Sequence, residues 1–114
     1  MTALFKVDFE VANNEDFRYA FAICDEHDTP VDLTGATFHM DIETRLGDNV
    51  LVLNIENGRI AVDPSIGRID LSVPAQDMAA LPANFHQHDM LMRLHGQTTR
   101  LWAGNFSIVQ GVTE

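Results

Sequence analysis

Apolar and polar residues alternate with a period of two along much of this chain. The pattern is clearest at residues 5–11, where Phe5, Val7, Phe9 and Val11 are separated by charged residues. Aromatic and aliphatic residues repeat it over 17–23, after a polar break at 13–16. Because successive side chains of a β-strand point to opposite faces, each segment predicts a strand with one buried face. The short break predicts a hairpin or a turn that crosses from one sheet to another.

The same pattern predicts further strands in the rest of the chain. They lie at residues 38–42, 50–55, 60–62, 69–73, 85–94, 100–103 and 105–109. Residues 50–55 are apolar enough to predict a strand buried on both faces. Asn57-Gly58 predicts a hairpin, because both residues tolerate positive φ. The segment Gly58-Arg59-Ile60 is echoed by Gly67-Arg68-Ile69, which indicates the two arms of a hairpin.

One segment favours a helix. Residues 74–81 carry helix-favouring side chains and are followed by Pro82, which cannot continue a helix. They predict one short helical turn near 75–81 that caps an end of the fold. We therefore predict an all-β protein, an antiparallel β-sandwich of the Ig-like type with about 7–9 strands, as one domain over residues 1–114. A small barrel is the alternative, and a parallel α/β sheet is excluded because strands never alternate with long helical patterns.

The chain is acidic. Its 114 residues include 7 Lys or Arg and 17 Asp or Glu, which gives a formal net charge of −10. Nucleic acids and anionic membranes attract proteins through Lys and Arg, so neither is expected as a partner. The hydrophobic fraction of 46% is that of a globular protein, and the negative charge suits docking to a basic surface.

The sequence shows no signal for a membrane or an oxidising compartment. Cys24 is the only cysteine, so no disulfide within the chain is possible. The first residues lack a basic region followed by an apolar run, and no apolar stretch approaches the ~20 residues of a transmembrane helix. We predict a protein that is cytoplasmic on synthesis, or released by lysis.

The best candidate for a metal site is the pair His86 and His88. Two histidines at i and i+2 of a strand face the same way and could share one ion. A third ligand would have to come from elsewhere in the chain. Met90 and Met92 continue the same face, which is more typical of a partly buried sheet face, and no metal or other cofactor is predicted.

Other residues that could bind a metal ion or act as a nucleophile have simpler explanations. An acidic loop could supply oxygen ligands to calcium. It lacks the spacing of an EF-hand, however, and is more typical of a solvated loop. Its members are Asp25, Glu26, Asp28 and Asp32. Cys24 and His27 could suggest a thiol nucleophile, yet a free cysteine at the end of an apolar strand usually packs as a small hydrophobe. No catalytic residue is predicted.

Several segments together resemble a family of small phage and prophage β-sandwich proteins, which includes domains like the N-terminal module of upper-baseplate proteins of tailed phages. The most specific match is Pro30-Val31-Asp32-Leu33-Thr34-Gly35-Ala36-Thr37. The other matching segments are Phe17-Arg18-Tyr19-Ala20-Phe21, Asn57-Gly58-Arg59-Ile60, residues 67–75, Leu81-Pro82-Ala83-Asn84-Phe85, His88-Asp89-Met90, and a closing hairpin with Gly96, Arg100-Leu101, Gly104 and Val112-Thr113. The chain departs from the pattern at Asn84, where glycine is usual, and at His86 and His88, where tyrosines are common.

The resemblance implies a structural role. The family has no established catalytic residues, so the chain is expected to be a non-enzymatic assembly module of a phage or prophage particle, in the tail, the baseplate or as a head accessory. Its expected partners are other phage or prophage structural proteins, and a second copy of the chain is an allowed partner. Aromatic and Met side chains are typical of interfaces, which selects one candidate contact surface. Its residues are His86, His88, Met90, Met92 and Trp102.

Two other function classes remain open at this stage. A carbohydrate-binding or host-surface-binding module would need a solvent-facing aromatic platform, for which the chain offers Trp102 and Tyr19. Both residues fall in alternating strands, which favours a place in the core or in an interface. A small metal-dependent or hydrolytic enzyme is the third class.

Overall fold

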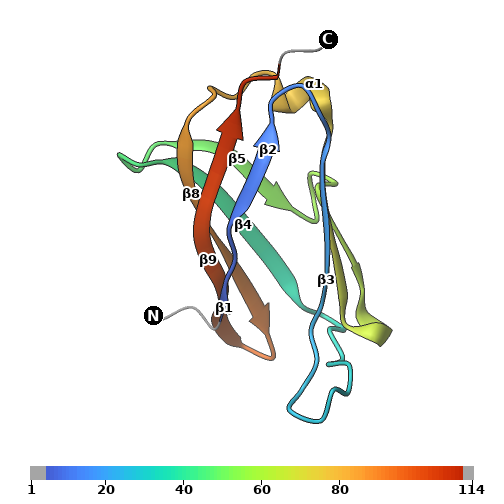
Figure 1. Ribbon diagram of the computed structural model, residues 1–114. Helices are drawn as coiled ribbons and strands as arrows, with labels where there is room; N and C mark the ends of the chain where they lie inside the picture. Colours follow the sequence, from blue (N-terminus) through green and yellow to red (C-terminus); the bar gives the residue numbers. More distant parts are fainter. Residues whose placement is uncertain (1–4, 112–114) are drawn as a thin grey trace.

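Two β-sheets lie face to face in the computed structural model, which describes residues 5–111 (Figure 1). The six-stranded sheet has the order β1-β9-β8-β4-β5, with β2 also paired to β9. Its strands are β1 (Phe5–Lys6), β2 (Phe9–Ala12), β4 (Thr37–Thr44), β5 (Asn49–Asn54), β8 (Phe85–Leu94) and β9 (Gln97–Val109). The three-stranded sheet has the order β3-β7-β6. Its strands are β3 (Phe17–Ala22), β6 (Ile60–Asp63) and β7 (Arg68–Val73).

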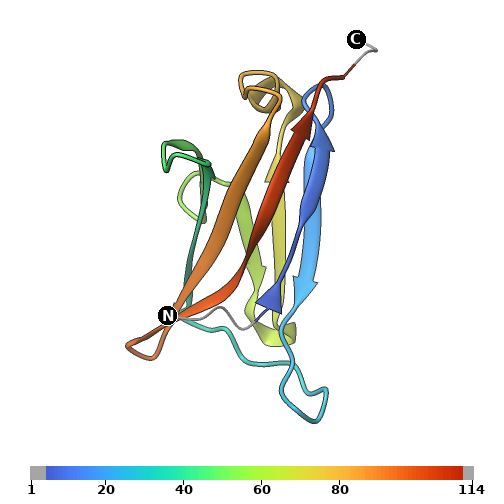
Figure 2. The ribbon, with the colours of Figure 1, turned by 60° about the vertical axis from the view of Figure 1, so that its left-hand side comes forward.

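The predicted all-β sandwich is confirmed. The two layers are clearest in Figure 2, where β3, β6 and β7 stand behind the longer strands of the six-stranded sheet. One detail differs from a purely antiparallel sandwich, because β1 and β2 both pair with β9 in parallel. The closing residues Val112 and Thr113, and residues 1–4, lie outside the described part of the chain.

The core forms where the inward faces of the two sheets meet. Each central strand contributes alternate residues, as the period of two predicts. The most deeply buried side chains include Met40, Ile42, Leu53, Ile60, Ile69, Leu71, Met90 and Phe106. Full burial of such a side chain contributes about 1.5–3 kcal/mol, so this shared interior is the main stabilising element.

The predicted helix is confirmed as a short turn. α1 (Ala75–Met78) lies at one end of the sandwich, and a one-turn 3-10 helix, η1 (Pro64–Ile66), joins β6 to β7 (Figure 1). Met78 and Leu81 are buried beneath the helical turn. The carboxylate of Asp16 accepts a hydrogen bond from the Ala75 amide at 2.7 Å, which ties the turn to the start of β3.

One sequence prediction about turns is wrong. Asn57-Gly58 does not form a hairpin: it lies between β5 and β6, which belong to different sheets, and only Gly58 has a positive φ, of 78°. The tight two-residue hairpin is instead His95-Gly96, with φ of 52° and 76°, which joins β8 to β9. Positive φ at both central residues matches the twist of antiparallel strands. The predicted strands 100–103 and 105–109 are parts of the one strand β9.

The strand predicted to be buried on both faces is an edge strand. β5 ends the six-stranded sheet and has only β4 as a neighbour. Leu51 and Leu53 are buried, whereas Val50 and Val52 are only partly covered. An apolar run alone does not show whether a second layer covers the outward face of a strand, which explains the error.

The N-terminal segment packs closely on β9. The predicted strand 5–11 is divided at Val7 and Asp8, where β1 ends and β2 begins. The Val7 amide donates to the Ala103 carbonyl at 3.0 Å, and the Asp8 carboxylate accepts from the Asn105 amide at 2.9 Å. Gly104 lies between these two contacts, and a side chain there would collide with the Val7 carbonyl oxygen.

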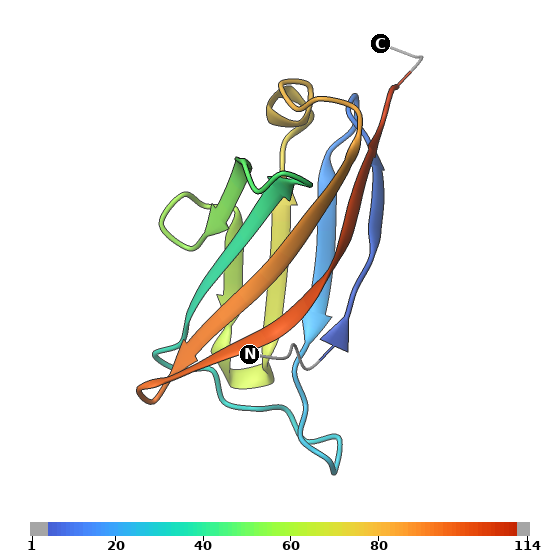
Figure 3. The same cartoon turned by 90° about the vertical axis from the view of Figure 1, so that its left-hand side faces the viewer.

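One side of the sandwich is open. β2 and β3 are consecutive in the chain and lie side by side at the edges of the two sheets, but they are not paired with each other (Figure 3). Aromatic rings fill the space between them. The ring of Phe9 lies 5.1 Å from that of Phe17 and 5.1 Å from that of Tyr19. We call this edge, formed by β1, β2 and β3, the open side.

Gly104→Ala is expected to lower the free energy of unfolding by about 3 kcal/mol, because the new methyl group would force the Val7 backbone away from β9. Chemical denaturation of the purified variant measures this change. Ser107→Ala on the same strand is the control and is expected to change stability by less than about 0.5 kcal/mol. Equal stability of the Gly104→Ala variant and the parent chain would show that the segment 7–8 is not tightly packed there.

Candidate functional site

His86 and His88 share one face of β8, as predicted, but that face is the core. Their side chains are 2% and 4% exposed. His86 Nδ1 lies 3.1 Å from the Asn84 carbonyl, and His88 Nε2 lies 2.6 Å from the Val7 carbonyl. A carbonyl oxygen only accepts, so both ring nitrogens are donors. Within residues 5–111, no group of three or more His, Cys, Asp or Glu is placed to hold a metal ion.

The other members of the predicted contact surface are also mostly inside. Met90 is fully buried, Trp102 is 2% exposed and Met92 is partly buried. The indole of Trp102 stacks on the ring of Phe21, with 4.1 Å between ring centroids. The assumption that these five side chains are exposed is therefore wrong. Alternation identified the residues that share a face, and that face points inward.

Because Trp102 is buried, it cannot serve as the solvent-facing platform that sugar binding would need. Tyr19 is half-exposed, but its ring lies 4.5 Å from that of Phe21 and faces the open side.

The acidic loop uses its carboxylates to shape its own turns. Asp25 Oδ1 accepts from the amides of His27 and Thr29, at 2.8 and 3.0 Å. Asp32 Oδ1 accepts from the amide and the hydroxyl of Thr34, at 2.9 and 2.6 Å, and these two bonds lower the pKa of Asp32. Such bonds are typical of Asx turns. Cys24, predicted to pack as a small hydrophobe, is exposed and forms an isolated bridge with Pro30.

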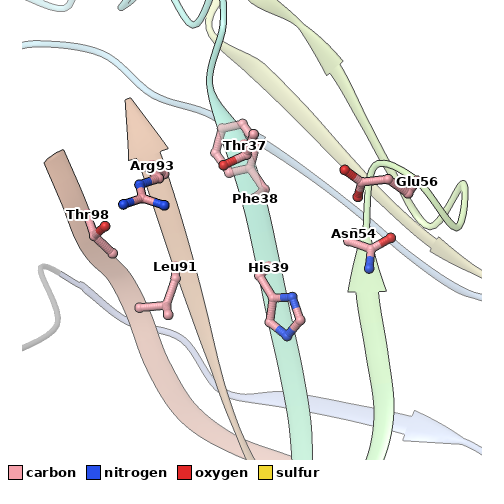
Figure 4. Close-up of a pocket in the computed structure, with 8 residues that line it drawn as sticks. All are labelled: Thr37, Phe38, His39, Asn54, Glu56, Leu91, Arg93 and Thr98. Atoms are coloured by element: carbon pink, nitrogen blue, oxygen red, sulfur yellow. The ribbon is translucent and has the colours of Figure 1, made fainter. Parts of the chain in front are cut away.

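The outward face of the six-stranded sheet carries a shallow groove of about 370 Å³ with a mixed lining (Figure 4). Leu91 and His39 lie near its middle, with Arg93 and Thr98 on one side and Asn54 and Glu56 on the other. Beside it, Asp41 Oδ1 accepts from Asn49 Nδ2 at 2.8 Å and lies 2.9 Å from His39 Nε2. Phe38, which also lines the groove, is buried, so the accessible lining combines the apolar Leu91 with polar side chains.

A groove with a mainly apolar lining lies on the open side. It has a volume of about 440 Å³ and runs between β1 and β3, and we call it the apolar groove. Its lining is Phe5, Lys6, Val7, Phe21, Ala22, Ile23, Cys24, Asp25, Asp28, Leu101 and Trp102. Trp102 Nε1 is buried and has no hydrogen-bond partner among the described residues. Phe5 is 60% exposed at the edge of this groove.

A second hollow continues the open side along β2. We call this the acidic groove; its volume is about 300 Å³. Its lining is Asp8, Phe9, Glu10, Val11, Glu15, Asp16, Phe17, Arg18 and Tyr19. Tyr19 shares a face of β3 with Phe17 and Phe21, as a core residue would, yet it is 46% exposed. Large exposed aromatic side chains beside a groove are typical of contact surfaces.

Sequence reasoning missed the open side. Alternation at 5–11 and 17–23 predicts two half-buried strands but does not show that they end their sheets. The one available signal is the short break at 13–16. Both a hairpin and a crossing turn were compatible with it, and the structure shows that the chain crosses from one sheet to the other.

Comparison of the chain with models of known protein families finds no match, and comparison with curated proteins finds no significant match. The resemblance to phage proteins therefore stays a prediction. Neither helix between residues 5 and 111 has the length and the apolar content needed to cross a membrane.

His88 is the titratable group most affected by the fold. Burial lowers its pKa, and the hydrogen bond to Val7 and the charges of Asp89 and Asp8 oppose this effect. The ring lies between Phe9 and Phe106, with centroids at 5.0 and 6.0 Å. Protonation would place a proton on Nδ1, which is buried without a hydrogen-bond partner among the described residues. The neutral form is therefore the one that the fold accommodates.

This environment predicts a loss of stability in mild acid. Above the unfolded pKa of about 6.5, His88 is neutral in both states. As the pH falls below that value, the unfolded state binds the proton first, so the free energy of unfolding decreases until the pH passes the folded pKa. Glutamine can still donate to the Val7 carbonyl but does not titrate. Urea unfolding between pH 7.5 and pH 5 is expected to show a free energy of unfolding that depends less on pH for His88→Gln than for the parent chain. The same pH dependence in both chains would contradict the assignment of this effect to His88.

Proposed function

We propose that this chain is a non-enzymatic assembly module of a phage or prophage particle, in the tail, the baseplate or as a head accessory, and that it acts through protein–protein contacts. The observation that supports this best is the open side. There Phe5 is 60% exposed beside the apolar groove, and Tyr19 is 46% exposed beside the acidic groove. Burial of aromatic area against a partner is favourable by about 25 cal/mol per Å².

The two surfaces of the molecule differ in a way that favours contact at the open side. The outward face of the six-stranded sheet carries ion pairs, such as Asp89 with Arg100 at 3.3 Å, and a polar groove beside them. A partner docking there would have to replace the water around these groups. The open side also carries charged groups, but there a partner would in addition cover exposed aromatic rings, whose desolvation is favourable.

The assignment to a phage particle is supported by the sequence motifs. In the most specific of them, Leu33 is buried, the Asp32 carboxylate caps the following turn and Gly35 has a φ of 81°. The motif therefore anchors the segment that enters β4. The carbohydrate-binding alternative has no comparable support, because Trp102 lies in the core.

Particles purified from the phage or prophage that encodes the chain are expected to contain it, as measured by mass spectrometry. The double variant Phe5→Ser, Tyr19→Thr is expected to reduce its incorporation by about tenfold, because a few buried aromatic residues carry most of the energy of an interface. Leu46→Ser is the matched control, since Leu46 is an exposed large hydrophobic, 92% accessible, in the loop between β4 and β5. Absence of the parent chain from the particles would refute the proposed function.

A further inference from the structure

The free edge of β3 exposes backbone groups. β3 pairs with β7 in the register Tyr19↔Leu71 and Phe21↔Ile69, and the Ile23 amide donates to the Gly67 carbonyl at 2.8 Å. Antiparallel strands bond through every second residue, so residues 17, 19 and 21 point their backbone groups at β7. The amides and carbonyls of the intervening residues therefore point away from the sheet. These residues are Arg18, Ala20 and Ala22, and all three are exposed.

The edge of β5 is closed by side chains. The Val52 carbonyl, which points away from β4, accepts from Asn57 Nδ2 and from Arg59 Nη1, both at 2.9 Å. Asn57 Oδ1 also accepts from the Asn54 amide at 3.2 Å. Arg59 is held in place by Asp77 of α1, at 3.2 Å. An incoming strand would have to displace this network.

The two remaining edges are less suited to accept a strand. β6 has four residues, and short edge strands pair weakly. On β2 the Ala12 amide is taken by Glu15 Oε1 at 2.9 Å. β3 has six residues, and the small side chains of Ala20 and Ala22 leave its edge accessible. Among the four sheet edges of residues 5–111, β3 is the best template for an added strand.

The surroundings of β3 define the chemistry of that strand. The apolar groove and the acidic groove both border β3, so side chains on one face of an added strand would meet Phe5, Tyr19 and Phe21. The two grooves are lined by six carboxylates against two cations. The carboxylates are those of Asp8, Glu10, Glu15, Asp16, Asp25 and Asp28, and the cations are Lys6 and Arg18. Such a surface attracts a basic segment.

We infer that β3 binds an extended segment of a partner protein by strand addition, and that this segment alternates apolar and basic side chains. The inference rests on the proposed function and specifies how the contact is made. Backbone hydrogen bonds to residues 18, 20 and 22 supply affinity, and the two grooves supply specificity. A second copy of this chain is a poor occupant, because it carries the same net charge of −10.

Ala20→Pro tests the backbone contact directly. The Ala20 amide points away from β7, so proline removes an outward donor without breaking a bond inside the sheet, and it is tolerated at such edge positions. Ala20→Thr is the matched control, since it changes the side chain and keeps the amide. Thermal unfolding of both variants verifies that the sandwich is intact.

The probe is a short synthetic peptide that alternates lysine and valine, followed by fluorescence anisotropy at low salt. The parent chain and Ala20→Thr are expected to bind it, and Ala20→Pro is expected to bind about tenfold more weakly. A matched peptide with glutamate in place of lysine is expected not to bind. In NMR spectra of the parent chain, the amides of Arg18, Ala20 and Ala22 are expected to shift most upon binding.

Three outcomes would overturn the inference: no binding of the lysine–valine peptide, equal binding by Ala20→Pro and Ala20→Thr, or NMR shifts centred on another edge. Self-association of the parent chain through β3 in sedimentation experiments, abolished by Ala20→Pro, would also overturn it in favour of a second copy. Particle incorporation separates the two proposals. Normal incorporation of Ala20→Pro would refute strand addition and leave the assembly role standing, whereas absence of the parent chain would refute the assembly role.

Discussion

The architecture depends on the parallel pairing of the N-terminal segment with β9. β1 and β2 form their backbone hydrogen bonds with β9, the last strand along the chain. β3 follows β2 after a short turn, yet it pairs with β7 in the other sheet and not with β2. The free edges of β2 and β3 therefore lie side by side. The open side, its grooves and its aromatic filling all lie along these two edges.

This pairing is held by a small set of close contacts. The Val7 carbonyl accepts from His88 Nε2 at 2.6 Å, while the Val7 amide donates to Ala103. Gly104 allows the two backbones to approach. His88 therefore works as a buried structural donor that joins β8 to the N-terminal segment. Its imidazole is well suited to this task, because it is apolar enough to lie between two phenylalanine rings and still offers an N–H group.

Much of the fold could be predicted from the sequence, because a period of two is a direct consequence of strand geometry. The strands around Phe17–Ala22, Thr37–Thr44 and Phe85–Leu94 were all expected. What the pattern does not contain is the order of strands in a sheet. For that reason Asn57-Gly58 was expected to close a hairpin although it links two sheets. The pattern also does not show which sheet faces are covered, so 50–55 was expected to be buried on both faces although Val50 and Val52 are only partly covered.

The candidate site was missed for the same reason. Alternating apolar residues look identical whether they face the core or a partner, so His86, Met90 and Trp102 were expected at a surface and are buried. The exposed aromatic residues are found where a regular strand runs along an edge, and the edge is a property of topology.

At the open side, the acidic residues affect whether copies of the chain can pair with each other. An edge strand beside exposed aromatic rings invites pairing between copies of the same chain, which is the usual route to aggregation. Carboxylates along the two grooves oppose that pairing, because each copy presents the same sign of charge. The same carboxylates lower the free energy of a complex with a segment of opposite charge. A surface that combines exposed aromatic rings with a surplus of carboxylates therefore disfavours pairing between copies of the chain and favours a segment of opposite charge.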